Sequence, residues 1–136
     1  MSEMLAPYAD AIPLIVLIVI LVMAQSFVAA FFRNAVEKHE AGAALEANHG
    51  SATYRMVRSF ENSLENVAMF FPAVALAVIA GVSPGWVYWV SLLFLLSRAA
   101  HWACYALNIP PARTLSFAVG FFATLALAIV TLMQSI

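Results

Sequence analysis

Charged residues are scarce in this sequence. Only 10% of the 136 residues are charged, six basic and seven acidic, while 65% are hydrophobic and the mean hydropathy is +0.95. Soluble domains carry about 25% charged residues, so these few charges cannot coat a water-exposed domain. Six basic residues also cannot form the positive surface of a nucleic-acid-binding protein. The composition therefore predicts a single domain over residues 1–136 that lies in lipid and has no nucleic-acid partner.

Cysteine is almost absent, and the histidines are widely separated. Cys104 is the only cysteine, which excludes an internal disulfide and a cysteine zinc site. His39 and His49 lie in a polar loop without the close spacing of metal ligands, so we expect solvated loop histidines. The chain also lacks a glycine-rich phosphate loop and a Ser-His-Asp constellation. We therefore expect no metal site.

Long uncharged runs measure the membrane spans. The run 11–32 is about 33 Å long as a helix, enough for a hydrocarbon core of roughly 30 Å. The charged residues before it, Glu3 and Asp10, are both acidic, whereas a signal peptide begins with basic residues. We therefore expect an uncleaved anchor. The run 66–97 is too long for one straight span and contains the turn sequence Gly-Val-Ser-Pro-Gly at 81–85. The run 114–136 follows a Pro-Pro pair that suits the start of a helix.

These runs predict an all-α, integral membrane four-helix bundle with up-down-up-down topology. We expect its helices over approximately 11–33, 54–80, 85–108 and 112–135.

The basic residues predict the orientation. All six lie at helix ends or loops on one side of the predicted bundle: Arg33, Lys38, Arg55, Arg58, Arg98 and Arg113. The positive-inside tendency places that side in the cytoplasm. Three aromatic residues, Trp86, Tyr88 and Trp89, cluster at the opposite turn, where amphipathic rings favour the headgroup layer. We expect a multi-pass protein of a bacterial inner membrane with both termini in the periplasm.

Two predicted helices carry a narrow polar stripe near the cytoplasmic side. At 100° per residue, each stripe occupies one face of an otherwise apolar helix. The stripes are Arg55, Arg58, Asn62 and Glu65 on the second helix, and Arg98, His101, Tyr105 and Asn108 on the third. Ionisable groups within a span cost several kcal/mol and usually face partners or a wet cavity, so we expect a functional pocket.

Two interpretations of these stripes remain open. In the structural one, Glu65 pairs with Arg98 or Arg58 and Asn62 bridges helices, while the arginines nearest the membrane surface reach to headgroups. In the functional one, the arginines outnumber the nearby carboxylates and bind an anion. Glu65 then accepts from an ammonium group and Asn62 bonds an amide, which matches a small zwitterionic peptide with two carboxylates.

The motifs resemble those of a known family. The strings Arg55-x-x-Arg58-x-x-x-Asn62-x-x-Glu65-Asn66, Arg98-x-x-His101-x-x-x-Tyr105 and Pro111-Ala112-Arg113-Thr114 are similar to the signature of the MAPEG family, the membrane-associated proteins in eicosanoid and glutathione metabolism. The resemblance implies a homotrimer with glutathione sites between neighbouring subunits, open to the cytoplasm.

The resemblance also implies roles for individual residues. The residues that line the glutathione site are Arg55, Arg58, Asn62, Glu65, Arg98, His101 and Tyr105. Arg113 matches the arginine that acts on the thiol, and a guanidinium there favours the attacking thiolate. The implied activity is that of a membrane-bound glutathione-dependent transferase or peroxidase, with glutathione as co-substrate and an apolar electrophile or lipid hydroperoxide as the second substrate.

Two positions differ from the pattern of catalytic relatives. Glu61 stands where these usually carry a basic ligand, and Phe117 stands where several have a tyrosine near the sulfur. Both differences favour an alternative, a non-catalytic member that binds lipid or acts as a scaffold, so whether the chain is an enzyme stays open. A third alternative is a small proton-coupled exporter with Glu65 as proton carrier, although the arginines would repel cationic cargo.

Overall fold

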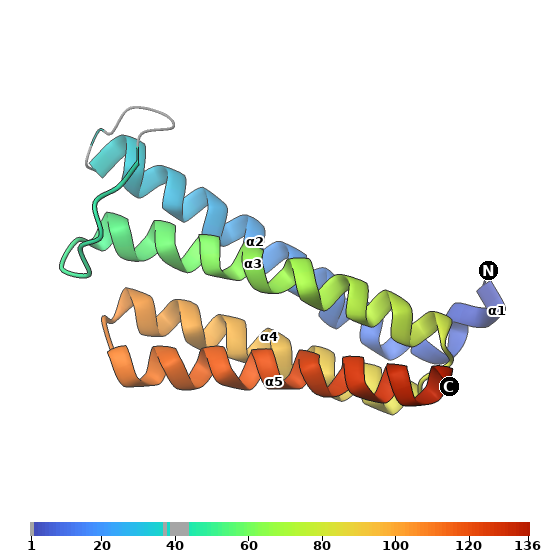
Figure 1. The fold of residues 1–136 in the computed structure, drawn as a ribbon. Coiled ribbons are helices and arrows are strands. Elements are labelled where there is room, and N and C mark those ends of the chain that lie inside the picture. The colour runs from blue at the N-terminus through green and yellow to red at the C-terminus, as the bar shows by residue number, and fades with distance from the viewer. Residues whose placement is uncertain (1, 37, 39–43) are drawn as a thin grey trace.

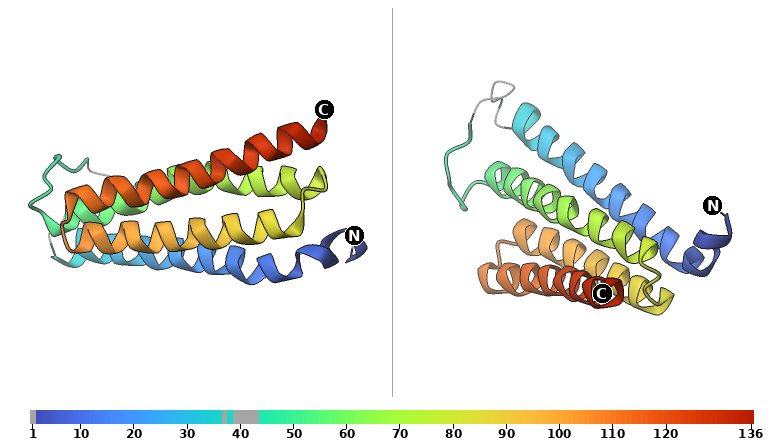
Figure 2. Two further views of the ribbon diagram at one scale, coloured as in Figure 1. Left: turned by 90° about the horizontal axis from the view of Figure 1, so that it is seen from below. Right: turned by 45° about the vertical axis from the view of Figure 1, so that its right-hand side comes forward.

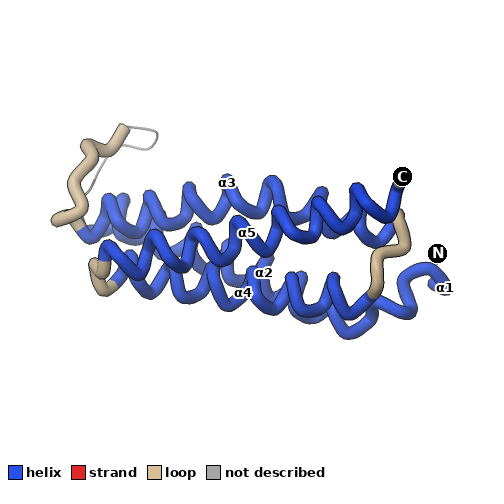
Figure 3. The backbone as a smooth tube through the Cα atoms, turned by 60° about the horizontal axis from the view of Figure 1, so that its bottom comes forward, coloured by secondary structure: helices blue, strands red, loops and turns tan. Residues whose placement is uncertain are grey.

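The computed structural model describes residues 2–36, 38 and 44–136. A short helix α1 (Ser2–Leu5) and a 3₁₀ helix η1 (Ala6–Ala11) lead into α2 (Ile12–Phe31), which ends in a single π-helical turn η2 (Phe32–Val36). Three long helices follow: α3 (Ala52–Ile79), α4 (Pro84–Ala106) and α5 (Pro110–Ser135). Within the described residues there is no strand (Figure 3).

The four long helices run up and down side by side (Figure 1). Each is long and apolar enough to cross a membrane, which confirms the predicted all-α fold with four spans. The expected ranges 11–33, 54–80, 85–108 and 112–135 overlap the residue ranges of α2, α3, α4 and α5, in that order. Both termini lie at one end of the bundle, hereafter the terminal end (Figures 1 and 2). The opposite end, hereafter the loop end, carries residues 44–51 and the turn between α4 and α5.

Local sequence sets where the helices begin and end. Ser51 caps α3 by accepting a 3.1 Å hydrogen bond from the backbone N–H of Tyr54. Gly81 ends α3 in the left-handed region with φ of +70°, and the next N–H, that of Val82, reaches back to the carbonyl of Ala77 at 2.9 Å. Asn108 ends α4 in the same way with φ of +55°. The chain therefore reverses sharply after α3 and again after α4.

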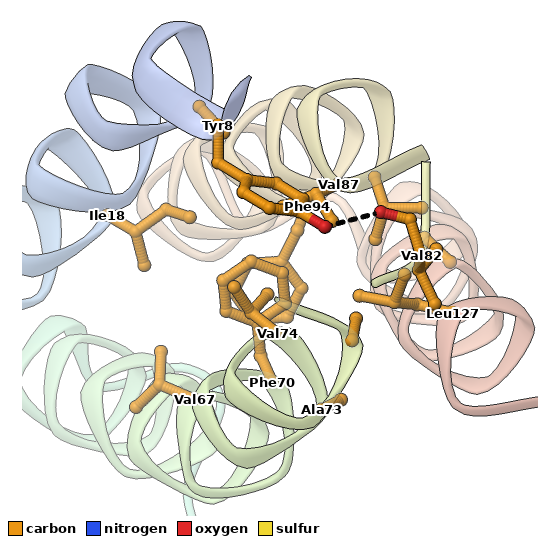
Figure 4. Close-up of a cluster of buried hydrophobic side chains, with 14 residues drawn as sticks. Tyr8, Ile18, Val67, Phe70, Ala73, Val74, Val82, Val87, Phe94 and Leu127 are labelled. Atoms are coloured by element: carbon orange, nitrogen blue, oxygen red, sulfur yellow. Dashed lines mark hydrogen bonds between the residues drawn. The ribbon is translucent and has the colours of Figure 1, made fainter. Parts of the chain in front are cut away.

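Apolar side chains fill the bundle interior toward the terminal end (Figure 4). Phe70 of α3 and Phe94 of α4 stack with ring centroids 4.0 Å apart. Tyr8 of η1 packs over this cluster, and its hydroxyl donates a 2.7 Å hydrogen bond to the carbonyl of Val82. This bond fastens the segment before α2 to the turn between α3 and α4.

The bundle interior toward the loop end is polar instead. It buries side chains that can hydrogen-bond or carry charge, namely Gln25, Thr53, Ser59, Ser63, Asn66, Ser97, Arg98, His101 and Ser116. The hydroxyl of Thr53 donates to the carbonyl of Phe32 at 3.4 Å, which sets α2 and α3 level with each other at this end. The interior is thus divided along its length, and the polar half holds the candidate site.

Candidate functional site

A cavity of about 390 Å³ opens between α3, α4 and α5 at the loop end. It is called the loop-end cavity here, and its lining residues are His49, Asn62, His101, Tyr105, Pro110, Arg113, Thr114 and Phe117. Small-molecule sites typically measure about 300–1,000 Å³ and place a few polar groups in an apolar wall. The lining has that character, because a guanidinium, an amide and two imidazoles share it with two aromatic rings, a proline and a threonine.

Arg113 lies in the first turn of α5 and is held from two sides. Its guanidinium carbon stands 4.7 Å from the centre of the Tyr105 ring, within the range of a cation–π contact. Its Nη1 donates a 2.8 Å hydrogen bond to Nδ1 of His49. The guanidinium is therefore fixed at the cavity wall by a helix residue and a loop residue.

His101 is buried beside Arg113. Its Nδ1 lies 3.0 Å from the carbonyl of Arg113 and 3.2 Å from the Ser116 hydroxyl. Its ring packs edge-to-face against Tyr105, with centroids 5.0 Å apart. Its other nitrogen, Nε2, is buried and makes no hydrogen bond within the described residues.

Arg98 crosses the bundle interior and is fully buried. Its Nη1 donates to Oδ1 of Asn62 at 3.0 Å, and its Nη2 donates to the carbonyl of Ser116 at 3.3 Å. The guanidinium carbon also lies between two aromatic rings, 5.7 Å from Phe94 and 5.8 Å from Phe117. Arg98 thus supports the cavity from behind by orienting the Asn62 amide that lines it.

Gly120 makes room for this arginine. A Cβ at this position would collide with the hydroxyl of Ser97 and lie 3.1 Å from Nη2 of Arg98. The close approach of α4 and α5 around Arg98 therefore requires a residue without a side chain.

Arg55 does not line the loop-end cavity. Its Nε donates to the carbonyl of Tyr105 at 2.9 Å, and its Nη1 donates to the carbonyls of His49 at 2.8 Å and Gly50 at 3.0 Å. All three of these hydrogen bonds are to backbone carbonyls, so Arg55 joins the end of α4 to the loop before α3.

Arg58 and Glu65 lie on the outer face of α3. Nη1 of Arg58 is 3.1 Å from Glu65 and 3.3 Å from Glu61, and all three side chains are partly exposed. Arg58 and Glu61 line a separate cavity of about 260 Å³ together with Arg33. Within one chain, neither Arg58 nor Glu65 lines the loop-end cavity.

The structure brings together part of the set expected from the sequence. Asn62, His101, Tyr105 and Arg113 share the loop-end cavity, and Arg98 reaches it through Asn62. The structural interpretation of the stripes also has its contacts, because Glu65 pairs with Arg58 and Asn62 bridges α3 to α4.

The family assignment follows from comparison with known sequences. The model of the MAPEG family matches residues 11–133. The chain belongs to the MAPEG family. No curated protein and no solved structure matches it. The match covers α2 to α4, nearly all of α5 and every candidate site residue named above, so it confirms the resemblance inferred from the motifs. The four apolar helices and the membership of this membrane family together identify the chain as an integral membrane protein.

Sequence reasoning missed one contributor to this MAPEG site. His49 lines the loop-end cavity and bonds Arg113, although its loop was given no functional role. Spacing could not reveal the contact, because 64 residues separate the partners. The other loop histidine, His39, lies outside the described residues. Within the part of the chain that the structure describes, no three His, Cys, Asp or Glu side chains are grouped to hold a metal.

A larger cavity of about 550 Å³ lies at the terminal end, between η1 and the start of α4. Its lining includes Tyr88 and Trp89 and a single charged side chain, Asp10. None of the site residues expected from the MAPEG motifs borders it.

Proposed function

We propose that this MAPEG protein is a membrane-bound glutathione-dependent transferase or peroxidase that acts on apolar electrophiles or lipid hydroperoxides. The observation that carries the proposal is the Arg113 guanidinium, held at the wall of the loop-end cavity by Tyr105 and His49. A fixed positive charge beside a thiol favours the thiolate, which is the attacking species. The reaction then requires no nucleophile from the protein.

The lining of the loop-end cavity fits a tripeptide thiol. Arg113 supplies forked donors for an anionic sulfur or carboxylate, and Asn62 and His101 supply neutral hydrogen-bonding groups. The cavity volume of about 390 Å³ lies within the range of small-molecule sites. Among the expected ligands that do not line this cavity, Arg58 and Glu65 form a partly exposed ion pair in the single chain. In the proposed homotrimer they complete the site of a neighbouring subunit.

Phe117 gives the cavity an apolar side. It lies one turn after Arg113, and its ring also packs against Phe121 with centroids 6.0 Å apart. Both rings are partly buried on α5. An apolar substrate dissolved in the bilayer can approach along these rings and meet the thiolate at Arg113. Reaction is then a matter of placing the two substrates together and stabilising charge.

The test is a thiolate titration. Purified protein in detergent is mixed with glutathione, and the ultraviolet absorbance of the thiolate is recorded against pH for the wild type and for Arg113→Ala. We expect the wild type to ionise bound glutathione at a lower pH than free glutathione, and Arg113→Ala to lose this effect while keeping its oligomeric state. Lys38→Ala, which removes an exposed basic residue from the same end, is the matched control. Equal thiolate formation by Arg113→Ala and the wild type contradicts the proposal.

A second candidate is a non-catalytic lipid-binding member. Phe117 presents a ring where a thiol-directed hydroxyl is common in the family, and two carboxylates neutralise Arg58. This alternative predicts lipid that remains bound through purification and no thiol-dependent turnover. The ion pair between Arg58 and Glu65 gives no support to an exporter in which Glu65 carries a proton.

A further inference from the structure

The loop before α3 carries a side chain into the candidate site. His49 is an exposed residue of this loop, yet its Nδ1 accepts a 2.8 Å hydrogen bond from Nη1 of Arg113. An arginine guanidinium has no acceptor, so Nδ1 must present its lone pair and the ring proton sits on Nε2. The contact thus specifies one tautomer of His49.

The backbone around His49 is fixed by several hydrogen bonds. Asn48 closes a tight turn, with its Oδ1 accepting from the N–H of Gly50 at 2.8 Å and its carbonyl accepting from the N–H of Ser51 at 3.0 Å. Arg55 bonds the carbonyl of His49 itself at 2.8 Å. The turn is therefore attached to the start of α3 through both Ser51 and Arg55.

Two tyrosines restrict the imidazole ring. Tyr54 lies edge-on to it with centroids 5.1 Å apart, and Tyr105 lies at 6.3 Å. Tyr105 also stacks under the Arg113 guanidinium. His49, Tyr105 and Arg113 therefore form one cluster. The Tyr105 ring packs against the face of the guanidinium, and the His49 imidazole accepts a hydrogen bond from it.

We propose that His49 is a positioning residue for Arg113. This role rests on the proposed glutathione chemistry. By accepting from one end of the guanidinium, His49 leaves the other donors directed toward the loop-end cavity, where a thiolate sulfur binds. Charge stabilisation depends on such fixed donors, because a freely rotating guanidinium must be ordered when the substrate arrives. The opposite role, in which His49 withholds Arg113 from the thiol, predicts the opposite effect of its removal.

The experiment compares three variants. His49→Ala removes the acceptor, His49→Asn keeps an acceptor near the position of Nδ1, and Glu46→Ala changes an exposed residue of the same loop as a control. Each is titrated with glutathione by thiolate absorbance, and kcat and KM are measured with an apolar electrophile. A glutathione-independent readout is the rate at which phenylglyoxal modifies Arg113, followed by mass spectrometry.

We expect His49→Ala to require a higher pH for thiolate formation and to lose kcat by a factor of about 5 to 10, which corresponds to one hydrogen bond of typical strength at an exposed position. KM for glutathione changes little, and Arg113 is modified several-fold faster. His49→Asn restores most of the thiolate formation and of kcat, and it returns the modification rate of Arg113 toward that of the wild type. Glu46→Ala behaves as the wild type.

Two results overturn the inference: unchanged kcat and modification rate in His49→Ala, or more thiolate in His49→Ala than in the wild type. A wild type that ionises no glutathione instead refutes the proposed function and any role of His49 in it. The phenylglyoxal rate then still decides whether His49 holds Arg113.

Discussion

Arg98 of α4 and Asn62 of α3 are joined by a 3.0 Å hydrogen bond between Nη1 and Oδ1 in the bundle interior. Asn62 also accepts from Nδ2 of Asn66, at 2.7 Å through its carbonyl and at 3.4 Å through its side chain. The bond therefore links a fully buried cation to a polar side chain that lines the loop-end cavity.

Asn62→Leu should destabilise the bundle because it deprives buried Arg98 of its side-chain acceptor. We expect a loss of about 1 to 3 kcal/mol, measured by chemical unfolding in detergent. Asn62→Asp is the control, since it keeps the acceptor and adds an opposite charge. If both variants are equally unstable, the hydrogen bond is not the source of the effect.

Gly120→Ala should destabilise the packing of α4 against α5. The added methyl collides with Ser97 and crowds Arg98, and overpacking of this kind costs about 1 to 3 kcal/mol. Gly85→Ala is the matched control, because the nearest atom to its Cβ is the Ser83 hydroxyl at 3.8 Å. Thermal unfolding that lowers the Tm of both variants alike would speak against a specific clash at Gly120.

Gln25→Leu should leave stability unchanged or increase it. The Gln25 side chain is 1% exposed, and neither polar atom has a hydrogen-bond partner within the described residues. A buried amide without a partner costs about 1 to 3 kcal/mol, which leucine avoids. Asn66→Leu is the contrasting variant, since the Asn66 amide is bonded and its removal should destabilise. Equal destabilisation by both changes indicates that Gln25 has a partner, such as an internal water.

Glu65→Gln separates the structural from the functional interpretation of the outer face of α3. Its ion pair with Arg58 is partly exposed, so its loss should cost less than about 1 kcal/mol. If Glu65 contacts glutathione across a subunit boundary, calorimetry should instead show an affinity loss of about tenfold. Unaltered affinity together with a clearly lower Tm assigns Glu65 to the structural role.

The spans could be predicted from the sequence because lipid imposes simple rules on length and charge. Gly81 and the Pro-Pro pair at 110–111 mark turns by local chemistry, which needs no knowledge of the rest of the fold. The grouping of Asn62, His101, Tyr105 and Arg113 follows from helical periodicity combined with the family motif.

Other features depend on contacts that periodicity does not encode. The bond between His49 and Arg113 joins a loop to a distant helix, and the need for Gly120 arises only where Arg98 crosses to α5. The sequence also could not show that Arg58 and Glu65 lie outside the loop-end cavity of one chain, because they share a stripe with Asn62 and periodicity does not specify which partner each side chain binds.

The division of the interior into an apolar and a polar half has a consequence for assembly in the bilayer. Lipid tails are as apolar as Phe70 and Phe94, so contact between these rings provides no hydrophobic driving force when the helices associate. It contributes only van der Waals packing. Polar groups such as Arg98 and Asn62 have far poorer alternatives in hydrocarbon. The attraction between inserted helices is therefore concentrated near one leaflet. We expect the helices to associate first in that leaflet and then along the rest of their length.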